Sequence, residues 1–98
     1  MAKPSELKKW ATIFRGLGNQ NRLHILQLLD RNGPMSVTEL SDELEISFKN
    51  TSRNLGILGA LDFVEFEGRK DRVYYSLSTR LTGEIKKLLR VTKIIKEL

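Results

Sequence analysis

The run from Ser36 to Leu77 limits the fold of this chain more than any other part of it. It contains two helix-length segments joined by a four-residue turn, followed by two strand-like segments with a polar loop between them. Ser36 and Glu39 have the spacing of a capping box, and Ser47 is placed to cap the second helix, which runs to about Ala60. A helix, a turn, a second helix and a hairpin in this order can place one helix in the major groove of DNA and a loop beside it.

The segments around this run predict a mainly α fold with one small β-hairpin. Apolar residues recur at helical spacing in two segments before the run and in one after it. We expect Ser5, Asn19 and Thr79 to cap these helices, and Gly18 to end the first with a positive φ. The second helix is apolar on a broad face and should lie at the centre of the core. The predicted order is α-α-α-α-β-β-α, with about five helices, in a single domain over residues 1–98.

The hairpin is predicted from alternation and residue type. Phe63–Glu67 and Arg72–Leu77 are rich in β-branched and aromatic residues, and Gly68–Asp71 is the loop between them. Asp62 directly precedes the first strand, and aspartate tolerates a turn with positive φ better than most residues. The cations at the loop suit contact with phosphate or the minor groove, although turn loops are polar in any case. They are Arg69, Lys70 and Arg72.

Composition narrows the class of protein. The chain has no cysteine and one histidine, which removes disulfides and thiolate metal sites, and it is compatible with a cytoplasmic location. No apolar run approaches the roughly 18 residues of a membrane span, and the first residues do not resemble a signal peptide. The net charge of +5 favours an anionic partner such as nucleic acid. The basic excess lies at the two ends, because residues 47–79 contain five basic and four acidic residues.

The second helix of the run carries the candidate DNA-reading residues. At about 100° per residue, Lys49, Asn50 and Arg53 fall in one outward sector. Arginine can pair with guanine, asparagine with adenine, and lysine with guanine or phosphate. Short hydroxyls near the same end add to this set, and they belong to Ser47, Thr51 and Ser52. The opposite face should hold Thr51 as well, together with leucines, and Phe48 should anchor the first turn from the inward side. The simpler alternative is an ordinary amphipathic surface helix.

The ordered motifs resemble those of the ArsR-type winged-helix repressors of bacteria and archaea, from about Phe14 to Leu77. The resemblance is carried by Leu17–Leu29, Ser36–Leu40, Ser47–Leu55, Gly68–Arg69 and Val73–Leu77. It implies a winged helix-turn-helix fold, a recognition helix that begins at Ser47, and binding to double-stranded DNA as a twofold dimer. Asn54 stands where the family usually has histidine, and it joins the expected DNA-contacting residues on that ground.

Departures from the family pattern predict no metal and no cofactor. Metal-sensing members use a cysteine pair where this chain has Val37–Ser41, and others use aspartate and histidine on the last helix, which here has neither. His24 lies among leucines and is expected to be a packing or surface residue, since one histidine cannot assemble a zinc site alone. Gly56 and Gly59 replace longer polar residues, and their role stays open. Whether a small molecule regulates the protein also stays open.

Two apolar stripes predict a homodimer. Both are larger than one small core needs, although they could instead pack on each other within one chain. They consist of Leu7, Trp10, Ala11 and Phe14 near the start, and of Leu81, Ile85, Leu88 and Ile95 near the end. A dimer would present two recognition helices to an inverted repeat about 34 Å apart. Occupying a promoter in this way would block the polymerase and repress transcription, and activation of transcription is the alternative outcome of binding.

Two other classes of function compete with DNA binding. A winged helix can bind protein rather than DNA, as an antirepressor or a subunit of a complex, and the near-neutral 47–79 segment is compatible with that reading. An enzyme is not expected, because the sequence offers no pair of nucleophile and base, no glycine-rich phosphate loop and no constellation of carboxylates.

Overall fold

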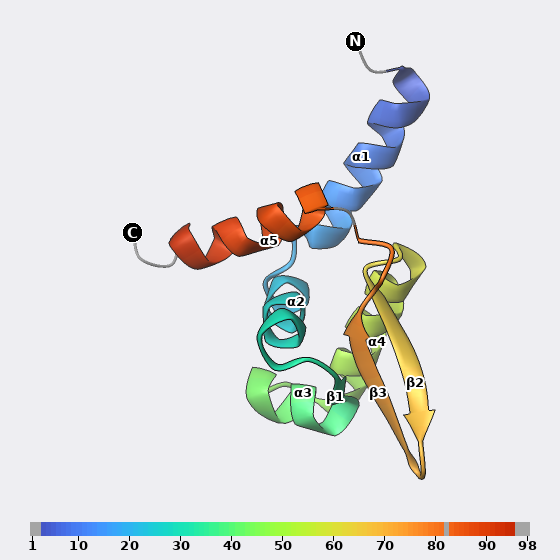
Figure 1. Cartoon of the computed structure of the whole chain (residues 1–98), viewed down its shortest axis with the longest axis vertical. Helices are drawn as coiled ribbons and strands as arrows, with labels where there is room; N and C mark the ends of the chain where they lie inside the picture. The colour runs from blue at the N-terminus through green and yellow to red at the C-terminus, as the bar shows by residue number, and fades with distance from the viewer. Residues whose placement is uncertain (1–2, 82, 96–98) are drawn as a thin grey trace.

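The computed structural model describes residues 3–81 and 83–95, and it contains five helices and three strands within them (Figure 1). In chain order these elements are α1 (Pro4–Leu17), α2 (Gln20–Asn32), β1 (Met35–Ser36), α3 (Val37–Leu44), α4 (Phe48–Ala60), β2 (Val64–Arg69), β3 (Arg72–Leu77) and α5 (Gly83–Ile95). The predicted mainly α fold with a hairpin is confirmed. β1 was not predicted, because two residues are too few to show a period.

The strands form one antiparallel sheet in the order β1-β3-β2. β1 adds to the root of the hairpin, where Met35 lies opposite Tyr75 and Ser36 lies opposite Tyr74. The hairpin itself is longer than predicted, since β2 continues to Arg69 and only Lys70 and Asp71 remain in the turn. In Figure 1 it extends as a narrow ribbon beside α4. The sheet therefore ties the start of α3 to the wing.

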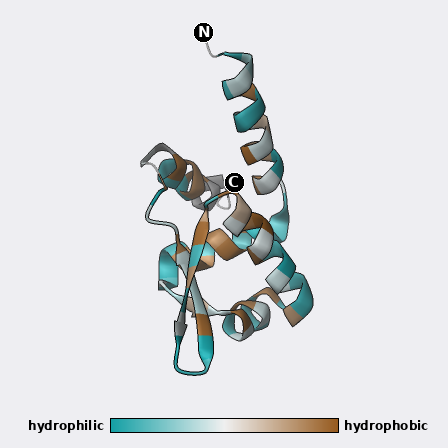
Figure 2. Ribbon diagram, turned by 90° about the vertical axis from the view of Figure 1, so that its right-hand side faces the viewer, coloured by the Kyte–Doolittle hydropathy of each residue, from teal (hydrophilic) through white to brown (hydrophobic). Residues whose placement is uncertain are grey.

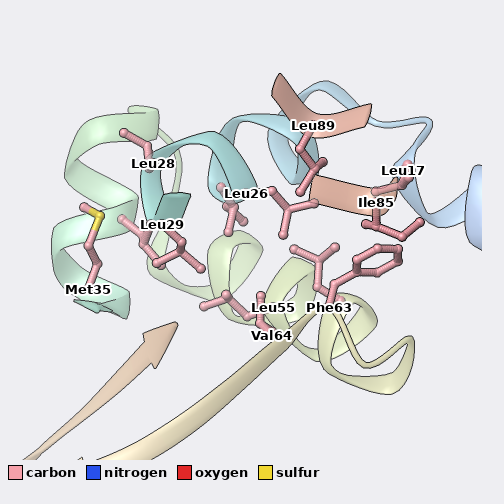
Figure 3. Packing of buried hydrophobic residues seen from close by; sticks show 13 residues of the cluster. Leu17, Leu26, Leu28, Leu29, Met35, Leu55, Phe63, Val64, Ile85 and Leu89 are labelled. Atoms are coloured by element: carbon pink, nitrogen blue, oxygen red, sulfur yellow. The ribbon is translucent and has the colours of Figure 1, made fainter. Parts of the chain in front are cut away.

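The core is built around α2, as its broad apolar face predicts. Four of its side chains are at most 2% exposed, and they are Ile25, Leu26, Leu28 and Leu29. Figure 3 shows three of them, Leu26, Leu28 and Leu29, among side chains from the neighbouring elements. These include Leu55 of α4, Phe63 and Val64 at the start of the hairpin, and Leu89 of α5. Burial of such a cluster from water is the main force that stabilises a domain of this size.

Three predicted caps are confirmed. Asn19 Oδ1 accepts a hydrogen bond from Arg22 N at 3.1 Å, and Ser47 Oγ accepts one from Asn50 N at 3.0 Å. The capping box is complete, because Ser36 Oγ accepts from Glu39 N while Ser36 N donates to Glu39 Oε1. These bonds satisfy backbone donors that the first turn of a helix leaves without partners. The starts of α2, α3 and α4 are thus set by local sequence.

Three predictions about helix ends are wrong. Ser5 does not cap α1, which begins one residue earlier at Pro4, a residue whose fixed φ suits the first helical position. Gly18 has φ −75° rather than a positive value, because the chain runs straight on into the cap of α2. Thr79 does not cap α5. Instead Ser78 closes a turn by accepting hydrogen bonds from Arg80 N and Leu81 N, and α5 begins later, at Gly83.

The predicted turn before the hairpin is confirmed. Asp62 has φ +61°, in the left-handed region that aspartate adopts more readily than most residues. It lies two residues after the end of α4 and redirects the chain into β2. Lys70 at the tip of the hairpin has φ +59° and reverses the chain between the two strands. These two residues set where the wing begins and where it turns back.

Candidate nucleic-acid interface

The first two turns of α4 present the predicted reading residues together on one exposed face. Lys49 and Arg53 are exposed, and Asn50 between them is partly exposed. Ser47 and Ser52 are exposed at the same end of the helix. The opposite side of α4 is held against the core by buried leucines, as the helical spacing predicts. This half of the helix therefore offers a row of polar side chains on a firmly packed support.

Two residues of the predicted set are not on that face. Thr51 is fully buried, and its hydroxyl donates to Ser47 O at 2.9 Å. Asn54 is 5% exposed and is bonded on both sides of its amide. Both lie on the inward side because Thr51, Asn54, Leu55 and Leu58 follow the spacing of one helix face. Their prediction as DNA-contacting residues is corrected to a supporting position.

Phe48 also differs from its prediction. It is 58% exposed and does not anchor the first turn of α4 from within. The anchor is Thr51, whose hydroxyl bonds to Ser47 O while its backbone N–H bonds to the same carbonyl at 3.0 Å. The helical spacing placed Phe48 near the inward side, at the edge of the face that Thr51, Leu55 and Leu58 occupy.

A chain of hydrogen bonds links the reading face to the interior. Arg22 of α2 donates from Nε to Gly16 O and from Nη1 to Asn54 Oδ1, the latter at 2.9 Å. Asn54 Nδ2 in turn donates to the backbone O and to the side-chain Oδ1 of Asn50, both at 3.0 Å. Sequence reasoning missed this role of Arg22. Arg22 directly precedes the apolar residues of α2, and its partner Asn54 is distant in sequence, so no local pattern indicated this role.

The wing carries its cations at the tip, where all three predicted residues are exposed. Arg69 Nη2 lies 3.4 Å from Glu67 Oε2, and its guanidinium lies over the ring of Tyr74 at 5.6 Å. The hydrogen bonds from the backbone and side chain of Ser36 lower the pKa of the Glu39 carboxyl most, and the positive charge of Arg72 lowers it further. Among the described residues, Lys70 has no carboxylate partner within 4 Å. Its charge is therefore the least compensated of the three.

The predicted dimer stripes fall into an exposed part and a buried part. On α1, Leu7 is 57% exposed, Trp10 is 42% exposed and Phe14 is 55% exposed, and Ala11 is exposed as well. Figure 2 shows α1 projecting away from the rest of the molecule, and the side chains of its stripe remain exposed in a single chain. The rings of Trp10 and Phe14 lie 5.8 Å apart and form a small exposed aromatic pair.

The α5 stripe is divided between core and surface. Ile85 is 7% exposed and belongs to the core, so its placement on a dimer surface is corrected, and Leu81 is partly buried against the same core. Leu88 is 38% exposed, and Val91 beyond it is 44% exposed. The side chain of Ile95 lies outside the described residues. The exposed apolar surface is therefore centred on α1, with α5 as a second contributor.

Within the described part of the chain, no group of three or more histidine, cysteine, aspartate or glutamate side chains is arranged to hold a metal ion. His24 is exposed on α2. None of the described helices combines the length and the apolar character needed to cross a membrane.

Comparison with known proteins agrees with this geometry. Residues 19–65 match the profile of the family described as bacterial regulatory protein, arsR family. The HTH-type transcriptional regulator MJ1325 of Methanocaldococcus jannaschii is 37% identical over 82 residues, which are 81% of this chain and 90% of that protein.

Two solved structures share the whole architecture. Reduced HlyU from Vibrio cholerae has a TM-score of 0.78 and 29% identity, and the match covers 93% of this chain and 92% of HlyU. The homodimeric winged helix-turn-helix DNA-binding domain Mb0332 of Mycobacterium bovis has a TM-score of 0.77 and 24% identity, over 99% of this chain and 91% of that domain. The long match to MJ1325, the family profile over the helix-turn-helix and the shared fold lead to one conclusion: the chain belongs to the ArsR family of transcriptional regulators.

Proposed function

We propose that this regulator binds an inverted-repeat operator in double-stranded DNA as a homodimer and represses transcription without a bound metal. The observation that carries the proposal is the row of exposed polar residues on the first two turns of α4, with three wing cations on the hairpin beside it. The absence of cysteine and the single histidine support the part of the proposal that concerns metal, because a four-ligand zinc site needs more donors of these types.

The two parts of the interface have different roles. Lys49, Asn50 and Arg53 read base edges in the major groove, and the hydroxyls of Ser47 and Ser52 contact bases or phosphates near the same end. The wing residues hold the DNA backbone by charge and carry little sequence information. Lys70 is freer than Arg69 to contact a phosphate, because the guanidinium of Arg69 is already held by Glu67 and Tyr74.

Dimerisation follows from the size of the reading unit. One recognition helix contacts only a few base pairs, so a longer site requires a second copy. The exposed apolar side chains of α1, with Leu88 and Val91 of α5, provide a surface that a second copy would cover. A twofold dimer would place two α4 helices about one turn of DNA apart, roughly 34 Å.

Selection of binding sites from random DNA tests the reading residues. Arg53→Ala should keep binding but relax the preference at one position of each half-site, by about 1–3 kcal/mol if the arginine contacts guanine with two hydrogen bonds. Arg80→Ala is the matched control, because Arg80 is exposed at the base of the hairpin and its side chain only reaches Asp62 at 3.8 Å. An Arg53→Ala protein that selects the wild-type sequence with undiminished preference would remove Arg53 from the reading set.

The salt dependence of binding tests the wing. Replacing Arg69, Lys70 and Arg72 together by alanine should weaken binding to all sequences alike and reduce the slope of log K against log salt by up to about 0.9 per lost phosphate contact. Arg80→Ala removes one charge at the other end of the hairpin and should leave the slope unchanged. If the triple variant retains the wild-type slope, the wing does not contact phosphate.

A second candidate function has one observation in its favour. Phe66 is 69% exposed and Val73 is 43% exposed on the hairpin, and the strand that carries Phe66 also carries the exposed residues Glu65 and Glu67. Exposed apolar residues on a near-neutral wing would suit a protein partner better than a phosphate backbone. Absence of DNA binding in a filter-binding assay at low salt would favour this second function.

A further inference from the structure

The hydrogen-bond chain behind α4 determines which atoms Asn50 can offer to DNA. The side-chain oxygen and nitrogen of asparagine are distinguished by their partners. Arginine only donates, so the Asn54 atom that faces Arg22 Nη1 at 2.9 Å is its oxygen. The Asn54 amide nitrogen then faces Asn50, where it donates to the backbone oxygen, which only accepts. The orientation of the buried Asn54 amide is therefore fixed on both sides.

The orientation of Asn50 follows from that of Asn54. Because Asn54 Nδ2 also donates to the Asn50 side chain at 3.0 Å, the atom that receives this bond is Asn50 Oδ1. The carbonyl oxygen of Asn50 is thus turned toward Asn54, which occupies one of its two lone pairs. Its amino group remains, and none of the described residues accepts a hydrogen bond from it. Asn50 is partly exposed, so this amino group is the part of the amide that is left for a ligand.

The neighbouring side chains have the same character. Lys49 and Arg53 only donate, and Ser47 Oγ already accepts a hydrogen bond from Asn50 N. Apart from the serine hydroxyls, the reading face consists of donors. In the major groove, guanine shows two acceptors, O6 and N7, whereas adenine shows an acceptor beside the N6 donor. Thymine has a single acceptor next to a methyl group.

We propose that Asn50 reads guanine and not adenine, and that Asn54, held by Arg22, is the positioning residue that sets this preference. The inference rests on the proposed function, and it corrects the expectation that the asparagine of α4 pairs with adenine. The bidentate pairing of asparagine with adenine N6 and N7 requires the Asn50 oxygen to face the base. Turning the amide over would place two amino groups against each other at the buried Asn54, with the loss of one hydrogen bond.

Asn54→Asp tests this inference, because aspartate has nearly the same shape as asparagine but has an oxygen, which cannot donate, in place of the amide nitrogen. Its carboxylate still accepts from Arg22, but the second oxygen cannot donate to Asn50 Oδ1. The Asn50 amide should turn over, with its amino group towards Asp and its oxygen towards the DNA. In site selection, the base read by Asn50 should change from guanine to adenine or cytosine, which show donors, by roughly threefold to tenfold in relative affinity.

Three further variants identify the base position and separate the effect of Asn54 from that of Asn50. Asn50→Ala should abolish preference at one position per half-site, and that position is the one to compare. Adding Asn54→Asp to Asn50→Ala should then change nothing at that position, because Asn54 acts only through Asn50. Asn54→Ala should relax the preference there without reversing it. Thermal unfolding of each variant shows that the compared proteins are folded.

Exchange of side-chain amide protons in the free protein, followed by NMR, gives a readout without DNA. The Asn54 amino protons should exchange slowly and those of Asn50 at close to the rate of a free amide. Three outcomes would each overturn the inference. The first is that the wild type selects adenine at the position identified by Asn50→Ala, and the second is that Asn54→Asp leaves the preference there unchanged. The third is that the Asn50 amino protons are protected from exchange. A wild-type protein that selects no sequence would instead overturn the proposed function, and the exchange measurement would still test the orientation of the two amides.

Discussion

Phe14→Ser should dissociate the proposed dimer while leaving each chain folded. Phe14 is 55% exposed in the single chain, and an aromatic side chain of this kind buries about 200 Å² when it is fully covered. A partner could therefore cover about 110 Å² more of this ring, which is worth about 3 kcal/mol at 25 cal/mol per Å². A twofold interface contains the residue twice, so the substitution removes up to about 6 kcal/mol of association energy and raises the Kd of the dimer by roughly four orders of magnitude.

Sedimentation equilibrium over a range of protein concentrations measures this change. Phe66→Ser is the matched control, because Phe66 is also a phenylalanine, is 69% exposed and lies on the wing, away from α1. It should dimerise like the wild type. Phe14→Ser should also lose affinity for an inverted repeat while it keeps its weak affinity for a single half-site. A Phe14→Ser protein with the wild-type Kd, or a Phe66→Ser protein that dissociates, would refute the assignment of α1 to the interface.

Three further predictions concern stability, each measured by urea denaturation. Glu39→Ala should destabilise the fold by a few tenths to about 1 kcal/mol at neutral pH. Because the folded-state pKa of Glu39 is lowered, this difference should be fully present above the ordinary pKa of 4.5 and be lost as the pH falls through the lowered pKa. An added Cβ at Gly16 would lie 2.1 Å from Leu61 Cδ1, the end of a partly buried side chain that can turn away, so Gly16→Ala should cost about 0.5–1.5 kcal/mol more in the wild-type background than in Leu61→Ala. Asp62→Val should cost about 1–3 kcal/mol because of its positive φ, whereas Asp62→Gly should change stability by less than about 1 kcal/mol. The first expectation is contradicted if Glu39→Ala and the wild type have equal unfolding free energies at all pH values. The second is contradicted by additive effects of the Gly16 and Leu61 substitutions, and the third by equal effects of the two Asp62 substitutions.

Elements whose signals are local could be predicted from the sequence. The caps at Asn19, Ser36 and Ser47 each depend on a side chain and a backbone N–H three residues apart, and all three are present. The turn at Asp62 depends on the conformational preference of one residue. The outward sector of α4 follows from the helix period alone. In each case the interacting groups are close in sequence, so the pattern contains the information needed.

The candidate site shows where local signals are insufficient. Asn54 was expected to contact DNA because of its position in the recognition helix, yet it is buried and bonded to Arg22, which lies 32 residues earlier. Ile85 was expected on a dimer surface, yet it packs into the core around α2. Both outcomes depend on which elements approach each other, and a helical period cannot distinguish a core partner from a surface partner.

By itself, the sequence determined the order of helices and hairpin, the residues that begin α2 to α4, and the cluster of donors on α4, because each of these depends on neighbours within a few residues. Only the tertiary structure decided that β1 joins the sheet, that α1 stands exposed with its aromatic pair, and that Asn50 turns its oxygen inward. These features depend on contacts between segments distant in sequence. The physical reason is that the burial and hydrogen bonding of a side chain are set by the packing of the whole chain around it.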